Sequence, residues 1–475
     1  MLPDVERLAR AARLDAFAAR LRAIGYDARA IASANKPGAL AFDPLRAPLR
    51  LWHLRRRTEA SAIATRIFFE GDDAREDEAR SALGDLAPWI DAGLVESREG
   101  RVASRFRIAP FGGGPDAPLV IGDALGAHED AVMAAGGTTI ALARAAIPSA
   151  RVASACDLGC GAGAIAVAMS RVAGRVVALD VNPRAIALTQ INARVNGASN
   201  VIAEVSDWFD AARGARFSLV ASQPPFAARA EGAANVAFLH GGARGDELPL
   251  RALSQIDSHL EDGGLAFVQA DWPILQETTR AALVDRMRAA MGERGDLVLF
   301  QAPNQDLDEV VAHYAAARHA DLGDAFRADA LALRDHFERV DVRAVCTALA
   351  IVRRAARGFS AQVPVRHAHD APITRDAVDR FVSAIDLARA SDEILDRADL
   401  EVAPGVTIAD APDLGDGVRG AIVRAAPPAL IQPFALDGDD ARALDEIARG
   451  ARSRDERTRR AARSLLLRGV LQSAR

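Results

Sequence analysis

Between about residue 119 and residue 354, short apolar segments alternate with longer segments of helical periodicity. In a chain of this kind each crossover helix packs on one face of a parallel sheet. The alternation therefore predicts an α/β fold with a doubly wound sheet that is covered on both faces. The expected strands are ASACDLG, RVVALDV, NVIAEVS, FSLVAS, GLAFVQA, LVLFQA and VCTALAIVR.

The composition is that of a globular chain. Of the 475 residues, 50% are hydrophobic and 26% are charged, which supplies enough apolar side chains for packed cores. The net charge of −5 excludes a uniformly basic protein that coats nucleic acid, although local basic surfaces are still expected. The apolar runs are shorter than the ~20 residues of a membrane-spanning helix, so we expect no membrane partner.

Two further features concern the cellular compartment. The first residues, MLPDVERLARAARLDAF, include early acids and lack the apolar region of a secretory signal. Cys156, Cys160 and Cys346 are too few for a disulfide framework and too scattered for a zinc site. We therefore expect a cytoplasmic protein without a metal site.

The length predicts about three domains at a typical size of ~150 residues. The first is expected over residues 1–112, where helices precede two short strands around Arg98-Glu99-Gly100, an order that resembles a winged-helix module. The α/β unit then covers residues 113–357. A third unit, α+β with winged-helix-like features, covers residues 358–475, and Thr374 is expected to cap its first helix.

A glycine turn, Gly159-Cys160-Gly161-Ala162-Gly163, follows the apolar ASAC strand and precedes the helical AIAVAMSRVA. A turn in this place brings backbone N–H groups close to a ligand. Asp157 stands two positions before Gly159, where a carboxylate would repel a pyrophosphate and suit an ammonium group. Asp180 ends the next strand, where an acid can hold the hydroxyl groups of a ribose. A cationic ligand with a ribose fits S-adenosylmethionine better than NAD.

Four motifs in this order resemble those of the class I S-adenosylmethionine-dependent methyltransferases, small-domain group: DLGCGAGAIA, ALDVNPRAI, VSDWF and SQPPF. The resemblance implies a Rossmann-like, seven-stranded sheet and a site for S-adenosylmethionine. The glycine loop would surround the methionine part, with one acid near its amino group, a second acid on the ribose, and an Asp-aromatic pair on the adenine. The residues that match are Asp157, Gly159, Gly161, Gly163, Asp180, Val181, Asp207 and Trp208 or Phe209, with Gly137 of Gly-Gly-Thr-Thr near the methionine carboxylate.

Gln223-Pro224-Pro225-Phe226 follows the strand FSLVAS, at the edge of the sheet where such folds bind ligands. It resembles the Asn-Pro-Pro-Tyr/Phe motif of methyltransferases that act on planar nitrogens. A carboxamide oxygen and a proline carbonyl can accept the two N–H bonds of such a nitrogen and direct its lone pair at the methyl group. An aromatic ring can stack on the planar group. Gln223 departs from the motif by one methylene, so the alternative is a loop that only shapes the pocket wall.

Other polar residues admit two interpretations. His240 is a conceivable general base, although a polar loop and helix start over residues 240–247 is favoured. Arg55-Arg56-Arg57, three arginines near the two short strands, and the tail from residue 441, with ten arginines and four acids, suit contact with RNA or an acidic partner. Solvated helix faces explain them equally well. The three arginines near the strands are Arg101, Arg105 and Arg107.

Together these observations predict an S-adenosylmethionine-dependent methyltransferase that modifies a planar amide or amino nitrogen of a macromolecule, either an rRNA or tRNA base or a protein glutamine. Gln223, Pro224, Pro225 and Phe226 would carry the reaction. Two alternatives stay open: a small-molecule (natural-product) methyltransferase, and a cofactor-binding regulator with reduced catalysis. A homodimer is compatible with the sequence.

Overall fold

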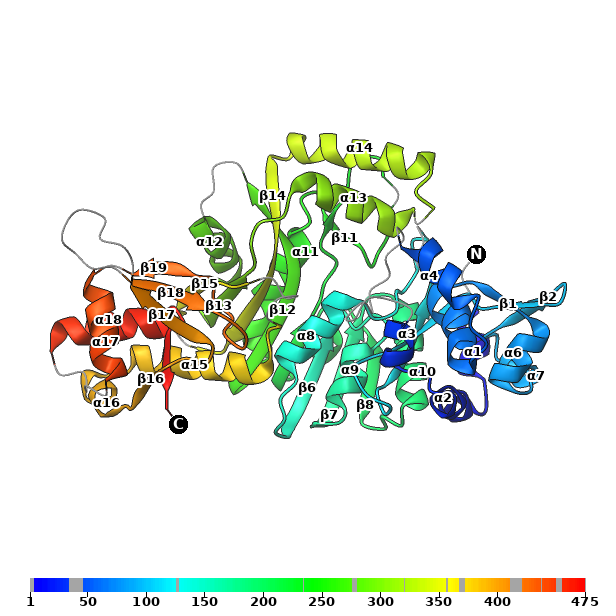
Figure 1. The fold of residues 1–475 in the computed structure, drawn as a ribbon, viewed down its shortest axis with the longest axis horizontal. Helices are drawn as coiled ribbons and strands as arrows, with labels where there is room; N and C mark the ends of the chain where they lie inside the picture. The colour runs from blue at the N-terminus through cyan, green and yellow to red at the C-terminus, as the bar shows by residue number, and fades with distance from the viewer. Residues whose placement is uncertain are drawn as a thin grey trace.

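The molecule is elongated, with the α/β unit in the middle, the N-terminal unit at one end and the C-terminal unit at the other (Figure 1). The geometry comes from a computed structural model. It describes residues 4–33, 46–124, 128–233, 235–275, 280–319, 321–355, 358–366, 372–410, 421–436, 438–449 and 455–474.

The central sheet has eight strands in the order β15-β13-β14-β12-β9-β6-β7-β8. All seven expected strands form, and β14 is the one that runs antiparallel to its neighbours. The eighth strand was not expected. It is β15, which pairs in parallel with β13, although the domain boundary expected after residue 357 places it in the third unit. It covers a backbone edge that would otherwise be exposed. The bounds are β6 (Val152–Leu158), β7 (Ala173–Asp180), β8 (Val201–Val205), β9 (Phe217–Ser222), β12 (Leu260–Leu275), β13 (Asp296–Gln301), β14 (Val342–Arg353) and β15 (Ser360–Pro364).

Helices cover both faces of this sheet, as the alternation predicted. Successive residues of β9 point to opposite faces, so Leu219 and Ala221 enter one apolar core and Val220 enters another. The first core contains α8 (Gly137–Ala146), α9 (Ala164–Met169), α10 (Pro183–Val195) and α15 (Arg375–Arg389). The second contains α11 (Glu247–Ile256) and α12 (Arg280–Met291).

A third apolar cluster lies beyond the carboxyl ends of the strands. Here α13 (Leu307–Arg318) and α14 (Asp324–Arg339) pack against the start of β14 and against β10 (Ala227–Ala228). The short β10 pairs with β11 (His240–Gly242). These elements rise above the strand ends in Figure 1 and flank the region where a ligand of this fold would lie.

The N-terminal unit ends in a three-stranded antiparallel sheet, ordered β1-β3-β2. The two strands expected around Arg98-Glu99-Gly100 form, and β1 joins them. A hairpin of β4 and β5 leads into the central unit. The elements are α1 (Val5–Ala9), α2 (Leu14–Ala23), α3 (Ala28–Ser33), α4 (Ala47–Leu54), α5 (Ala60–Ala64), a π-helical turn (Thr65–Glu70), β1 (Asp73–Arg75), α6 (Glu76–Leu83), α7 (Ala87–Asp91), β2 (Glu96–Arg98), β3 (Arg101–Ala103), β4 (Phe106–Pro110) and β5 (Leu119–Asp123).

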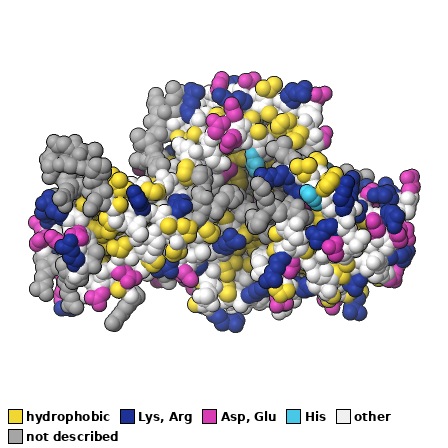
Figure 2. Space-filling view, in the orientation of Figure 1, with side chains coloured by type: hydrophobic (Ala, Val, Ile, Leu, Met, Phe, Trp, Pro, Cys, Tyr) yellow, Lys and Arg dark blue, Asp and Glu magenta, His cyan; other side chains and the backbone are white. Residues whose placement is uncertain are grey.

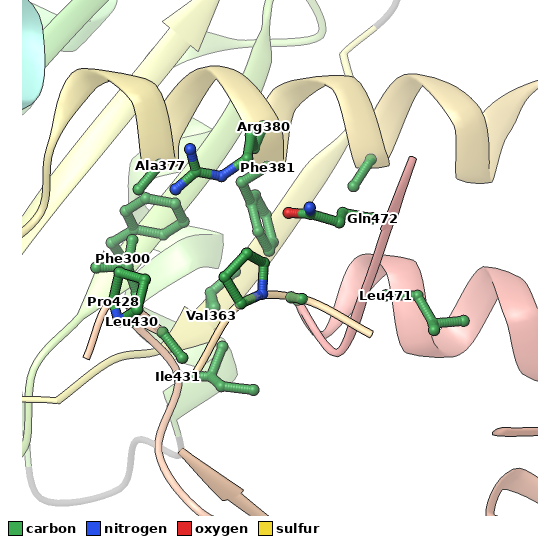
Figure 3. A pocket seen from close by; sticks show the side chains of 15 residues that line it. Phe300, Val363, Ala377, Arg380, Phe381, Pro428, Leu430, Ile431, Leu471 and Gln472 are labelled. Carbon is green, nitrogen blue, oxygen red and sulfur yellow. The ribbon is translucent and has the colours of Figure 1, made fainter. Parts of the chain in front are cut away.

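The C-terminal unit begins with α15, whose N-cap Thr374 accepts a hydrogen bond from the Ala377 N–H group, as expected. Strands β17, β18 and β19 form one antiparallel sheet, and β16 pairs with β20. A small cavity of about 60 Å³ lies where α15 and β13 meet the rest of this unit, and mainly apolar side chains line it (Figure 3). The remaining elements are α16 (Asp392–Arg397), β16 (Leu400–Val402), β17 (Val406–Asp410), β18 (Ala421–Ala425), β19 (Phe434–Leu436), α17 (Gly438–Ala448), α18 (Glu456–Leu467) and β20 (Leu471–Ser473).

Within the described ranges, no helix has the length and hydropathy that crossing a bilayer requires.

Candidate functional site

The register of the sheet aligns the ends of β6, β7 and β9 with one level of the longer β12. Leu158 of β6 pairs with Leu179 of β7 and with Ser222 of β9, and Ser222 pairs with Val268 of β12. The residues that come next along each strand therefore lie at one level along the sheet edge. They are Gly159, Asp180, Gln223 and Gln269. The glycine turn, Asp180 and the Gln-Pro-Pro-Phe segment thus meet at one edge.

The glycine turn needs its glycines. Gly159, Gly161 and Gly163 have φ angles of 74°, 54° and 76°, a left-handed region that favours glycine. A Cβ atom at Gly163 would lie 2.7 Å from the Thr189 Oγ1 atom, so close packing against α10 is a second reason for this glycine. Cβ atoms at Gly159 and Gly161 would meet open space. The outer side of the turn therefore leaves room for a ligand.

Asp157 is buried at the end of β6. Its Oδ2 atom accepts a hydrogen bond of 2.8 Å from the Ala166 N–H group, which joins the strand to the first turn of α9. Burial is the main reason that its pKa is raised to about 7, and the charge of Asp180 raises this pKa further. A cation bound beside Asp157 would oppose both effects and favour the ionised form.

Asp180 joins β7 to the glycine turn. Its Oδ2 atom accepts from the Gly161 N–H group and its Oδ1 atom from the Asn182 N–H group, both at 2.9 Å. Burial raises the pKa of this carboxyl group above its usual value, although both hydrogen bonds lower it. A carboxylate offers about four acceptor positions, so two are left for the hydroxyl groups of a ligand. Beside it, the Val181 side chain is 66% exposed and offers an apolar surface.

Asp207 and Trp208 follow β8, and α11 contributes a residue that the sequence analysis missed. The Arg251 guanidinium donates to the Asp207 Oδ2 atom at 2.8 Å and lies over the Trp208 ring, 5.5 Å from its centre. Phe209, the alternative aromatic residue, is buried and stacks on His259. Of the two rings, that of Trp208 is the one with exposed surface.

The Gln-Pro-Pro-Phe segment is held by its neighbours. The Gln223 Nε2 atom donates to the Thr138 Oγ1 atom of α8 at 2.6 Å. Pro224 is buried, whereas Pro225 and Phe226 are half-buried, and the Phe226 ring packs against two of the apolar clusters. A Cβ atom at Gly241 would lie 2.5 Å from the Pro225 carbonyl oxygen, so this glycine lets β11 approach the segment.

Gly137 opens α8 and is exposed, beside Thr138. The chain that leads to it is fixed by Asp123, whose carboxylate forms an ion pair with Arg184 at 2.6 Å. Asp123 also accepts from the Val132 N–H group at 2.8 Å. Because Arg184 belongs to α10 and Asp123 to β5, the start of α8 is tied to the same framework as the glycine turn.

His240 has the environment of a structural residue. Val236 donates its N–H group to the Nδ1 atom, and the Arg318 guanidinium lies 2.9 Å from the Nε2 atom. Burial, together with the charges of Arg318 and Arg229, lowers the pKa of His240 to about 4. The ring is therefore neutral near pH 7, with both nitrogens engaged, which favours the polar-loop interpretation over a general base.

The sequence analysis did not predict the polar group around Asp271, which lies along β12 from the level of the Gln-Pro-Pro-Phe segment. Asp271 of β12 lies three positions beyond Val268, the register partner of Ser222. Its carboxylate accepts from the Tyr314 hydroxyl at 2.9 Å and from the Thr347 hydroxyl at 2.6 Å. Burial raises the pKa of Asp271. Where the chain is described, no cluster of three or more His, Cys, Asp or Glu side chains has the geometry of a metal site.

The arginine-rich segments are largely engaged with acids of the same unit. The ion pairs include Arg55 with Asp72, Arg101 with Asp73 and Arg459 with Asp396. Arg107 is buried over the Phe69 ring. On the face shown in Figure 2, basic and acidic side chains are interspersed at both ends of the molecule. This charge pattern gives less support to an RNA-binding surface than the sequence count did. Further pairs are Arg57–Glu59, Arg105–Glu96, Arg463–Asp392 and Arg468–Asp440.

The central segment is similar to known methyltransferases. Residues 137–244 match the family model described as the methyltransferase small domain. A release factor glutamine methyltransferase of Xylella fastidiosa is 31% identical over 127 residues, 24% of this chain and 46% of the relative. Its counterpart in Escherichia coli is 40% identical over 72 residues, 15% of this chain and 26% of the relative. The chain thus spans less than half of the length of either of these two relatives.

Solved structures match over a wider part of the chain at lower identity. The ribosomal protein L11 methylase of Lactobacillus delbrueckii is 16% identical, with 46% of this chain and 77% of that chain covered and a TM-score of 0.27.

Proposed function

We propose that this chain, which carries a methyltransferase small domain over residues 137–244, transfers a methyl group from S-adenosylmethionine to a planar amide or amino nitrogen. The observation that carries the proposal is the shared level of three strand ends. The glycine turn after β6, Asp180 at the end of β7 and Gln223 after β9 stand side by side. A cofactor held by the first two would therefore present its reactive end to the third.

The residues at this edge fit the cofactor. Gly159 and Gly161 leave open space at the turn, and Asp180 keeps acceptor positions for a ribose. Asp157 is a buried carboxyl group whose pKa no cationic side chain of the described residues lowers, which suits the amino group of the methionine part. The exposed apolar side chain of Val181 and the ring of Trp208 offer surfaces for the adenine. We assign Asp207 to the adenine amino group and Gly137 to the methionine carboxylate.

S-adenosylmethionine supplies a methyl group that is electrophilic because it is bonded to a sulfonium. The chain's own residues orient the acceptor. The Gln223 Oε1 atom and the Pro224 carbonyl accept the N–H bonds of the planar nitrogen, which directs its lone pair at the methyl group and stabilises the positive charge that develops on it. Pro225 keeps the segment rigid, and the exposed part of Phe226 stacks on the planar group.

The substrate we favour is a glutamine side chain of a protein. The two curated relatives described above are named as methyltransferases that act on a glutamine of release factors. RNA is the second candidate, and it is less favoured because many arginines of both flanks are paired with acids. A small-molecule substrate and a cofactor-binding regulator remain outcomes of the experiment below.

The flanking units complete the proposal. Residues 1–112, 113–357 and 358–475 are proposed as three domains, with the α/β catalytic domain in the middle and β15 of the third domain added to its sheet. From α5 to β3 the first unit runs helix, strand, helix, helix, strand, strand, with its strands in one antiparallel sheet. This order supports a winged-helix module that presents the macromolecular substrate. A cytoplasmic location and a homodimer are the remaining parts of the proposal.

The experiment uses purified protein, methyl-labelled S-adenosylmethionine and an extract of cells that lack the gene, separated into protein, RNA and small-molecule fractions. Asp180→Ala is the blank, and Asp324→Ala, whose side chain is 97% exposed on α14, is the matched control. Label on protein glutamine supports the proposal. Label in RNA or in small molecules moves the substrate to those classes. Cofactor binding without label in any fraction contradicts methyl transfer and favours the regulator.

A further inference from the structure

The contact between Gln223 and Thr138 involves the residue at which the Gln-Pro-Pro-Phe segment departs from the Asn-Pro-Pro-Tyr/Phe motif. A glutamine has one more rotatable bond than an asparagine, so its carboxamide has more orientations to lose. Here the Gln223 Nε2 atom lies 2.6 Å from the Thr138 Oγ1 atom, and both side chains are half-buried. The contact joins β9 to α8 across 85 positions of sequence.

We infer that Thr138 is a positioning residue, which fixes the Gln223 carboxamide with its oxygen toward the nitrogen to be methylated; this inference rests on the proposed function. Among the described residues, Gln223 is the partner of the Thr138 hydroxyl, and the Gln223 Oε1 atom has none. With the nitrogen of the carboxamide held by α8, the oxygen remains available as the acceptor. In the reverse orientation of the Gln223 carboxamide, the oxygen would accept from Thr138 and an N–H group would point toward the substrate.

The proposed cofactor determines which group donates the hydrogen bond between Gln223 and Thr138. A threonine hydroxyl has one hydrogen to donate, whereas a carboxylate can only accept. If the methionine carboxylate lies at the start of α8, as we propose, the Thr138 hydroxyl donates to it. Its oxygen is then left to accept from Gln223, and the carboxamide has to use its N–H group. Cofactor binding would thus select the orientation in which the Gln223 oxygen accepts from the substrate.

The first test needs no catalysis. The protein is labelled with 15N at its glutamine side chains, and the Gln223 signals are identified by their loss in Gln223→Asn. Thr138→Val removes the hydroxyl at nearly constant volume, whereas Thr138→Ser keeps it. We expect Thr138→Val to shift the Gln223 side-chain signals and to abolish their response to S-adenosylhomocysteine, and Thr138→Ser to restore both. Unchanged signals in Thr138→Val would overturn the inference even if methyl transfer is established.

The second test is a double-mutant cycle on the labelled substrate fraction. At saturating cofactor we expect Thr138→Val to lower kcat about 10- to 100-fold, as displacement of a reacting group by ~1 Å does. Cofactor affinity should fall as well, because the hydrogen bond from the hydroxyl to the methionine carboxylate is lost. Thr138→Ser should retain most of kcat. The shorter side chain of Gln223→Asn would no longer reach Thr138, so Thr138→Val should then add less than about threefold.

Equal losses from Thr138→Val in both backgrounds would overturn the inference, because the two residues would then act independently. A loss confined to cofactor affinity, with kcat unchanged, would overturn it as well and make Thr138 a simple cofactor contact. If wild-type protein methylates no fraction, the proposed function fails, while the 15N spectra still decide whether Thr138 orients Gln223.

Discussion

Asp157 is a carboxyl group in a place where ionisation is costly. It is buried, and its pKa is raised to about 7. The folded state therefore holds this proton between about pH 4 and pH 7, whereas the unfolded state has released it. Because the folded state binds more protons in this window, Asp157 makes the free energy of unfolding fall as the pH rises through it.

This environment predicts a pH dependence that Asp157→Asn removes. Without cofactor, the wild-type protein should lose roughly 3–4 kcal/mol of stability from this group between pH 4 and pH 7, and Asp157→Asn should show a flatter profile. Urea unfolding at several pH values measures the difference. S-adenosylmethionine should bind with release of protons near pH 7, because its ammonium group favours the ionised carboxylate. Identical profiles for the two proteins would contradict the assigned pKa.

Asp180 has two roles that a pair of substitutions can separate. Asp180→Ala should weaken S-adenosylmethionine binding by about 2–4 kcal/mol, because it removes the acceptors for the ribose hydroxyls. It also releases the N–H groups of Gly161 and Asn182. Asp180→Asn keeps one acceptor oxygen and should lose less. Calorimetric titration measures both affinities, and unchanged affinity in Asp180→Ala would show that the ribose lies elsewhere.

Three side-chain contacts that sequence reasoning missed at this site are long-range. The residues of the motifs were predicted because each stands at a fixed place after an apolar strand. Their partners lie far along the chain: Thr138 is 85 positions from Gln223, Arg251 is 44 from Asp207, and Tyr314 is 43 from Asp271. No local pattern links such pairs, since only the folded sheet brings α8, α11 and α13 over the strand ends.

At the scale of elements, the strands that were predicted are those with a continuous apolar run. Six of the seven expected strands lie inside the sheet with mostly buried residues, so burial itself selects their composition. The seventh, β8, is a largely exposed edge strand that was predicted from its β-branched residues. The short β1 and β15 were not predicted. The three residues of β1 are Asp73–Arg75, and β15 is half-exposed along most of its length. Strands at a sheet edge need backbone partners more than apolar side chains, and their sequences therefore carry little signal.

At the turn from β6 into α9, the cost of steric overlap can be separated from the cost of a left-handed backbone. Gly163 has a left-handed backbone, and a Cβ atom there would also meet Thr189 at 2.7 Å. Gly197, at the end of α10, has a φ of 67° and open space around it. Gly197→Ala should cost about 1 kcal/mol of stability for its backbone alone. Gly163→Ala should cost about 1–3 kcal/mol more, because α10 has to shift. Chemical denaturation compares the two, and equal losses would argue against close packing at Gly163.

At the scale of the molecule, the site lies in the middle of an elongated arrangement, and each flank is attached to one end of the sheet (Figure 1). The N-terminal unit contacts α10, where Arg194 donates to the Ala9 carbonyl at 2.6 Å. The C-terminal unit is joined through α15 and through β15, which extends the sheet. Because both flanks are attached to elements that frame the site, a substrate held by a flank would stay at a fixed place relative to Gln223.

A buried carboxylate contributes to the attachment at the C-terminal end. Asp296, at the start of β13, accepts from Arg353 of β14 and from Arg389 of α15, both at 2.9 Å. It also accepts from the Phe359 N–H group, just before β15, at 3.0 Å. A single side chain thus joins two strands, the helix that begins the C-terminal unit, and the segment that leads into the eighth strand.

Removal of this carboxylate should weaken the whole C-terminal junction. Asp296→Ala leaves two guanidinium groups without a shared partner, and we expect it to lower the free energy of unfolding by about 2–3 kcal/mol. This is less than the ~3–5 kcal/mol of a fully buried pair, because the Arg389 side chain is 39% exposed. Asp262→Ala, which breaks a pair with Arg354 at a carboxylate that is 94% exposed, is the control and should cost below about 1 kcal/mol. Urea unfolding gives both values, and limited proteolysis should cleave Asp296→Ala first near residues 354–360. Equal stabilities of the two variants would mean that apolar packing of α15, rather than Asp296, holds the C-terminal unit to the sheet.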